Sequence, residues 1–311
     1  MRADSPRRAM ALLAVFALAW VLLEEVLGRL LRQPYPLLQV VWCRYAAHLG
    51  LVLVIFGWRQ PSHLWRTARL RFHLLRSMCM LVMPLGFVMS VGAGAPSGFV
   101  WSIFWAAPVL VLLIARRWLS EPLPDAQART ARQVQWVSLA CTIAAALLLW
   151  PRPWPDQFTA AALPLSFGWA LAMTVSFALY VVMTRSLRTE ALQANLFYTA
   201  IGVFALLTPL MPSIWVMPTA HDAAVLFGIG ALGLVCLVAL DRAAAAAPLA
   251  LSAPGLYAFL PSLALVGYLL QDGLHTGASV RRLLVVAAIT LALAYLWHRM
   301  PRVAAQPVLP G

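Results

Sequence analysis

The sequence predicts an all-α integral membrane protein with ten transmembrane helices. Apolar stretches of about twenty residues, the length that crosses a bilayer, recur between Met10 and Trp297 and are bounded by arginines. Hydrophobic residues make up 63% of the chain and charged residues 11%, and the mean hydropathy is +0.84. A soluble protein needs more polar surface than this composition supplies, so a soluble fold is excluded.

Ten segments have the length and composition of membrane-crossing helices. They lie at about residues 10–29, 36–57, 72–92, 97–114, 133–150, 163–184, 192–211, 222–240, 249–270 and 280–298. The longest gaps between them, near 58–71 and 115–132, are each shorter than twenty residues. We therefore expect no separate soluble domain.

The formal net charge of +13 would suggest a nucleic-acid partner in a soluble chain. Here the charge follows the expected topology. With the N-terminus in the cytoplasm, sixteen arginines fall in inner segments and five in outer segments. Because inner loops of membrane proteins are enriched in basic residues, we expect both termini to be cytoplasmic. The expected surroundings are membrane lipid, and no nucleic-acid partner is expected.

Tryptophans and cysteines fit the same interpretation. Eight of the thirteen tryptophans fall at or just beyond the predicted helix ends, where indoles favour the membrane interface: Trp58, Trp65, Trp118, Trp136, Trp150, Trp154, Trp215 and Trp297. The four cysteines lie singly in four different spans: Cys43, Cys79, Cys141 and Cys236. This spacing predicts neither a metal site nor a disulfide, and no cofactor is expected.

Two stretches suggest an internal duplication. FWAAPVLVLLIARRWLSEPL, at 104–123, and YAFLPSLALVGYLLQDGL, at 257–274, each place a proline early and an acidic residue at the far end. The pairs are Pro108 with Glu121 and Pro261 with Asp272, thirteen and eleven residues apart. Five helices per half would invert the second half relative to the first, an architecture of transporters.

At these residues the chain resembles the EamA-type transporters of the drug/metabolite transporter superfamily, over essentially its whole length. The resemblance is carried by PLLQVVWCR at 36–44, LSEPL at 119–123, FGWALAMTVSFALYVVMTRSLR at 167–188 and APGLYAFLPSLALVGYLL at 253–270. It implies ten helices in the bacterial inner membrane and movement of small organic solutes such as amino acids, vitamins, drugs or toxic metabolites, with export as the default direction. The two EamA-like repeats would be residues 1–150, ending with the helix at 133–150, and 151–311.

A few ionisable residues lie inside the predicted helices, where a charge costs about 2.5 to 3.5 kcal/mol on insertion scales. Glu25 can pair with Arg29 one turn later. Glu24 points about 100° away and is the better candidate to pair with Arg44 on the next helix, either as a structural bridge or in transport. His48 shares a helix face with Arg44. It is either a packing residue or, with Glu24, a proton carrier.

Three aromatic residues lie in mid-helix positions and are candidate solute contacts or simple packing residues: Trp20, Trp105 and Tyr257. Pro108 and Pro261 can kink their helices beside a cavity. Arg76, near an inner helix end, is expected to snorkel to the headgroups without a special role.

These residues predict a secondary transporter that moves a small organic solute by alternating access. Arg44 favours a solute that carries a carboxylate. The alternatives are a membrane scaffold or sensor without transport and an intramembrane enzyme, although no HExxH, P-loop or GxSG pattern is present. A homodimer stays open, because Gly228, Gly230 and Gly233 can pack within one chain as readily as between two.

Overall fold

The structure is a computed structural model that describes residues 5–30, 35–58, 62–119, 125–149, 162–270 and 280–300. All the regular structure in these ranges is helical. The elements are α1 (Pro6–Leu30), α2 (Leu37–Val52), the π-helix η1 (Leu53–Gly57), α3 (Ser62–Trp65), α4 (Leu70–Gly92), α5 (Ser97–Phe104), α6 (Ala107–Trp118), α7 (Asp125–Leu149), α8 (Leu163–Ser186), α9 (Leu192–Leu207), the 3₁₀ helix η2 (Thr208–Leu210), α10 (Met211–Ile214), α11 (Ala220–Ala246), α12 (Leu249–Ser252), the 3₁₀ helix η3 (Ala253–Ala258), α13 (Phe259–Leu270) and α14 (Val280–Arg299).

Within the described ranges, eight helical spans are long and apolar enough to cross a membrane. They are Pro6–Val26, Leu37–Gly57, Leu70–Gly92, Ser97–Trp118, Leu163–Ser186, Leu192–Ile214, Ala220–Ala246 and Leu249–Val266. The predicted all-helical fold is therefore confirmed, and the eight apolar spans agree with a multi-pass membrane protein.

The other two predicted spans correspond to α7 and α14. Helix α7 begins at Asp125, eight residues before the predicted start, because the polar stretch DAQARTAR continues the helix. The apolar part of α14 is the shorter helix Leu284–Arg299.

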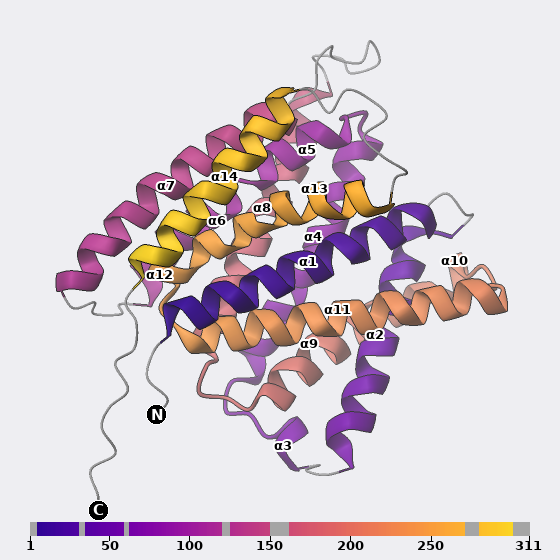
Figure 1. The fold of residues 1–311 in the computed structure, drawn as a ribbon. Helices are drawn as coiled ribbons and strands as arrows, with labels where there is room; N and C mark the ends of the chain where they lie inside the picture. The colour runs from indigo at the N-terminus through magenta and orange to yellow at the C-terminus, as the bar shows by residue number, and fades with distance from the viewer. Residues whose placement is uncertain are drawn as a thin grey trace, which may run out of the picture.

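The long helices pack side by side, so that helices distant in sequence become neighbours (Figure 1). The two most extensive contacts are α1 with α11 and α4 with α8. Helix α2 packs against both α11 and α9, while α7 and α14 lie alongside each other at one flank of the bundle (Figure 1).

The first and last helices meet on one side of the bundle. The backbone N–H of Ser5 donates to the carbonyl of Ala246 at 2.9 Å. The Arg7 guanidinium donates to the carbonyls of His298 and Met300 at 3.3 and 3.2 Å. The start of α1, the end of α11 and the end of α14 therefore share one side, which we call the N-terminal side.

Two of the long helices are interrupted at the predicted prolines. A turn at Trp105 separates α5 from α6, which has Pro108 in its first turn. Helix α12 passes through the 3₁₀ segment η3 before α13, which has Pro261 in its first turn. Proline has no N–H to donate to the preceding turn, which is consistent with a break in regular α-helix just before each of these prolines.

The tryptophans predicted to lie in interfacial belts differ in exposure from those predicted at mid-helix. Six of the eight tryptophans assigned to helix ends are exposed: Trp58, Trp65, Trp118, Trp136, Trp215 and Trp297. The mid-helix residues Trp20 and Trp105 are buried instead. Trp150 and Trp154 lie outside the described residues.

Glycines let α2 and α11 approach closely within one chain. A Cβ added at Gly230 would lie 2.3 Å from the Cβ of Ala47, and one at Gly233 would lie 2.5 Å from Nε2 of His48. At Gly228, a Cβ would have no neighbouring atom within 4 Å. Two of the three glycines therefore serve packing inside the chain.

We predict that Gly230→Leu lowers thermal stability in detergent, by about 1 to 3 kcal/mol, because the added side chain forces α2 away from α11. Gly228→Leu is the matched control on the same helix and should leave the melting temperature close to that of the wild type. Equal melting temperatures for the two variants would contradict this account of the contact.

Candidate functional site

An aromatic cluster fills the centre of the bundle around Trp20 on α1. Its indole ring lies 5.0 to 6.2 Å, between ring centroids, from five neighbours: Phe16, Trp101, Phe104, Phe177 and Phe259. These neighbours come from α1, α5, α8 and α13. The cluster therefore joins helices from the beginning, the middle and the end of the chain.

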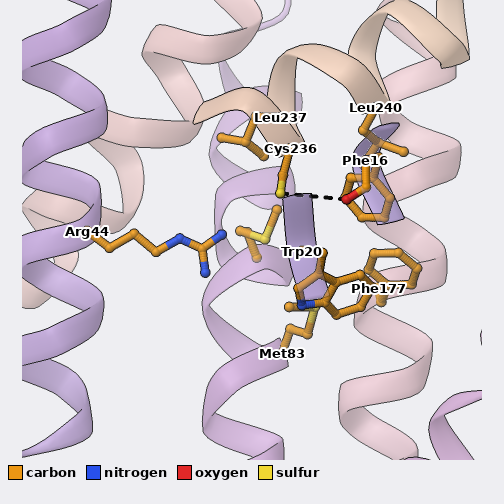
Figure 2. A pocket seen from close by; sticks show the side chains of 9 residues that line it. Phe16, Trp20, Arg44, Met83, Phe177, Cys236, Leu237 and Leu240 are labelled. Carbon is orange, nitrogen blue, oxygen red and sulfur yellow. Dashed lines mark hydrogen bonds between the residues drawn. The ribbon is translucent and has the colours of Figure 1, made fainter. Parts of the chain in front are cut away.

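A small cavity lies beside this cluster (Figure 2). Its lining is formed by Phe16, Trp20, Arg44, Met80, Met83, Phe177, Cys236, Leu237 and Leu240. The volume of about 20 Å³ has room for about one water molecule. The thiol of Cys236 faces the carbonyl oxygen of Phe16 at 3.8 Å. In this conformation the cavity is too small to hold an organic solute.

Arg44 provides the charged group of the cavity. Its side chain extends from α2 toward the wall that contains Trp20 and Phe177 (Figure 2). Its Nε is buried and has no hydrogen-bond partner, and its guanidinium carbon lies 5.6 Å from the centre of the Tyr45 ring. A Cβ at position 233 would lie 2.7 Å from this Nε, so Gly233 makes room for the side chain.

Glu24 has a different direct partner from the predicted one. The indole N–H of Trp20 donates to Oε1 of Glu24 at 2.8 Å. Although the charges of Glu24 and Arg44 interact, no direct ion pair joins these two described residues. The predicted salt bridge between them is therefore wrong, because the i, i+4 spacing on α1 brings Trp20 closer to the carboxylate.

His48 lies one turn after Arg44 and is fully buried. Its ring packs edge-on against Tyr45, with centroids 4.9 Å apart. Neither ring nitrogen has a hydrogen-bond partner of ordinary geometry among the described residues. His48 does not line the cavity. Its two alternative roles, as a packing residue or as a proton carrier, both stay predictions.

Trp105 and Tyr257 stand at the two helix interruptions and lie 6.2 Å apart between ring centroids. Thr142 of α7 ties them together. Its hydroxyl donates to the carbonyl of Trp105 at 2.9 Å and lies 2.6 Å from the hydroxyl of Tyr257. Neither aromatic side chain lines the cavity in this conformation. Their evident contribution is to hold the interrupted helices against α7.

A buried polar network on the N-terminal side was not expected from the sequence. Arg76 on α4 is only 1% exposed. Its guanidinium donates to the hydroxyls of Thr184 and Thr199, at 3.2 and 2.8 Å, and to the carbonyl of Asn195. The amide of Asn195 in turn donates to Oδ1 of Asp241 at 2.8 Å. The prediction that Arg76 snorkels to the headgroups is wrong, because α8 and α9 cover it.

The opposite side of the bundle is tied by contacts between α2 and the segment that leads into α11. The side-chain amide of Gln39 both donates to and accepts from the backbone of Val216, at 2.6 and 2.8 Å. The hydroxyl of Tyr35 donates to Asp222 at 2.6 Å, and this hydrogen bond raises the pKa of Tyr35. Both contacts fix α2 against α11 on this side.

Several predicted features lie outside the described residues. They are Glu121, Asp272 and the side chains of Arg29, Arg281 and Arg282. The acidic ends of the proposed duplication, and the predicted pair of Glu25 with Arg29, are therefore untested.

The fold and the site define a multi-pass α-helical membrane protein with a charged cavity at its centre. No known family profile and no curated protein matches the chain. Among 22 matching chains of solved structures is one described as "Crystal structure of protein". It aligns with a TM-score of 0.69 at 16% identity, over 94% of this chain and 95% of that one. This similarity shows a shared fold.

We predict that Arg76→Met lowers the free energy of unfolding by about 2 kcal/mol, because buried acceptors on α8 and α9 lose their donor. Arg71→Met is the control, since Arg71 is exposed near the same end of α4. The measurement is thermal unfolding of both purified variants in one detergent. A snorkelling role for Arg76 would instead make the two variants equally stable.

Proposed function

We propose that the protein is a secondary transporter that moves a small organic solute through the central cavity by alternating access. The observation that carries the proposal is Arg44. A guanidinium with an unpaired buried Nε projects into an apolar and aromatic cavity at the centre of membrane-spanning helices. A charge in such a place is costly and marks a ligand or ion pathway in membrane proteins.

The helix contacts support an arrangement of ten helices in two inverted halves, divided after α7. Under that division α1 corresponds to α8, and α4 corresponds to α11. The contact of α1 with α11 is then equivalent by symmetry to the contact of α8 with α4, and these are the two most extensive contacts. Because α2 corresponds to α9, the contact of α2 with α11 is likewise equivalent to the contact of α9 with α4. Two halves related by a pseudo-two-fold axis in the membrane plane can rock about a central site, as alternating access requires.

The interrupted helices support the same proposal. In the inferred halves, α5–α6 corresponds to α12–η3–α13, and both contain a break near the aromatic cluster. Interrupted helices in corresponding positions of two halves are a marker of substrate sites in transporters.

The chemistry of the cavity favours an amphipathic solute with a carboxylate. Arg44 can form a bidentate pair with a carboxylate, while Trp20, Phe177 and the neighbouring methionines can contact an apolar part. Because the cavity holds about one water molecule in this conformation, solute entry requires the helices around it to separate. In the proposed cycle, this conformation would be one that holds no solute.

Further parts of the proposal rest on the resemblance to EamA-type transporters and on arginine distribution. They place the protein in the bacterial inner membrane with both termini cytoplasmic, and they make export the default direction. Without an ATP-binding motif, the energy comes from an ion gradient or from the gradient of the solute itself. No catalytic constellation is proposed, so the protein is not assigned as an enzyme.

Expression in a bacterial host should redistribute a carboxylated metabolite between cells and medium, as measured by untargeted mass spectrometry. Arg44→Ala, at matched abundance in the membrane, should lower this redistribution roughly tenfold or more through loss of a charge-assisted contact. Arg44→Lys should retain part of the activity, because it keeps the charge without the bidentate geometry.

Two outcomes would contradict the proposal. One is a metabolite profile that is the same in cells with the wild type and in cells with an empty vector. The other is equal loss of transport for carboxylated and neutral solutes in Arg44→Ala, which would remove the preference for a carboxylate.

Glu24 is the second residue to test, as the proposed proton carrier. We predict a wild-type transport rate that changes between about pH 5 and 8 and a Glu24→Gln variant that is slower and insensitive to pH. Glu25→Gln is the matched control on the next residue and should keep the wild-type pH profile. Normal transport by Glu24→Gln at every pH would eliminate this role.

A further inference from the structure

The polar network lies directly on the N-terminal side of the cavity. On α11, Asp241 immediately follows the cavity residue Leu240, and the helix ends soon afterwards on the N-terminal side. On α4, Arg76 precedes the cavity residue Met80 by one turn, about 6 Å along the axis. The network therefore forms a layer across the bundle just beyond the cavity.

Three hydrogen bonds in this layer join α11 to α8 and α9, two helices with which it otherwise has little contact. Helix α11 packs chiefly with α1 and α2, α8 packs chiefly with α4, and α9 packs about equally with α2 and α4, whereas α11 makes only small contacts with α8 and α9. The amide of Asn195 on α9 donates to Asp241 on α11 at 2.8 Å, and the guanidinium of Arg185 on α8 donates to the carbonyl of Ala244 on α11 at 2.6 Å. Arg185 is 2% exposed and also reaches the carbonyl of Ala245.

Arg76 holds one of these bonds in position. It donates to the backbone carbonyl of Asn195 and to Thr199 on the next turn of α9. The side-chain amide of the same Asn195 is then directed at Asp241. The result is a continuous connection from α4 through α9 to α11.

The polar character of this layer suits a contact that opens and closes. When such a layer separates, water replaces the lost hydrogen bonds, so the net cost is small. Separating an apolar layer of the same size would expose hydrophobic surface to water without compensation. Separating the polar layer therefore costs less free energy than separating the apolar cavity wall beside it.

We propose that Asn195, Asp241 and Arg185 form the gate that closes the cavity toward the N-terminal side. This inference rests on the proposed transport function. In the gate-open state α8 and α9 separate from α11, the hydrogen bonds between them break, and the cavity becomes continuous with the aqueous phase on that side.

Cys236 offers a built-in reporter of the gate, because it lines the cavity and is 3% exposed. Replacing Cys43, Cys79 and Cys141 by alanine leaves it as the single thiol. A membrane-impermeant maleimide, applied to oriented vesicles from either side, then measures access to the cavity. Asp241→Ala should raise the labelling rate from the N-terminal side about two- to tenfold, the population shift expected for one lost hydrogen bond.

Asp222→Ala is the matched control. Both carboxylates lie on α11 and each accepts a side-chain hydrogen bond, at 2.6 Å for Asp222 and 2.8 Å for Asp241. The partner of Asp222 is Tyr35, which precedes α2, so this bond lies between two helices that already pack extensively against each other. We expect Asp222→Ala to leave labelling from the N-terminal side unchanged.

Asn195→Ala breaks the same bond from the other helix and serves if Asp241→Ala does not reach the membrane. Faster labelling from the N-terminal side in either variant, and not in Asp222→Ala, would support the gate. Labelling no faster than in the single-cysteine parent, or equally faster in the control, would overturn it. The assay needs no solute, so its result is independent of whether the proposed transport is observed.

Discussion

The cost of placing a charged side chain at the depth of the hydrocarbon layer governs this structure. Each such group must find protein around it, because lipid offers no hydrogen-bond partner. Arg76 satisfies this requirement with acceptors on α8 and α9, and Glu24 does so through the indole of Trp20. The buried Nε lacks a partner in both Arg44 and Arg76, but Arg76 makes three side-chain hydrogen bonds whereas Arg44 makes none to another described residue. This difference separates the structural charges from the one we assign to solute recognition.

Close packing makes that placement feasible. Gly230 and Gly233 allow α11 to pack closely against α2. A side chain at position 233 would overlap Arg44 and His48, so the glycine leaves room for both. On the other wall, rings from α1, α5, α8 and α13 converge on Trp20. The cavity is thus enclosed by helices from both inferred halves, and any relative motion of the halves changes its size. Motion about such a site is what the proposed transport requires.

The length of the apolar stretches made most helices predictable, since a bilayer fixes that length. Helix α7 was predicted to begin at residue 133 and begins at Asp125, because polar residues can extend a helix beyond the membrane and hydropathy does not detect them. The surroundings of Arg76 were not predictable, because a charge near a helix end looks the same whether lipid or two other helices cover it. The contact of Trp20 with Glu24 was detectable in principle from the i, i+4 spacing.

The central claim is that the cavity beside Arg44 lies on the path of a carboxylated solute. The most direct test is release from liposomes that contain the purified protein and are preloaded with a metabolite extract of the expression host. Our account predicts that one carboxylated solute, or a few chemically related ones, leaves the wild-type vesicles faster than it leaves vesicles with Arg44→Ala or without protein. Release that is the same from all three preparations would contradict it.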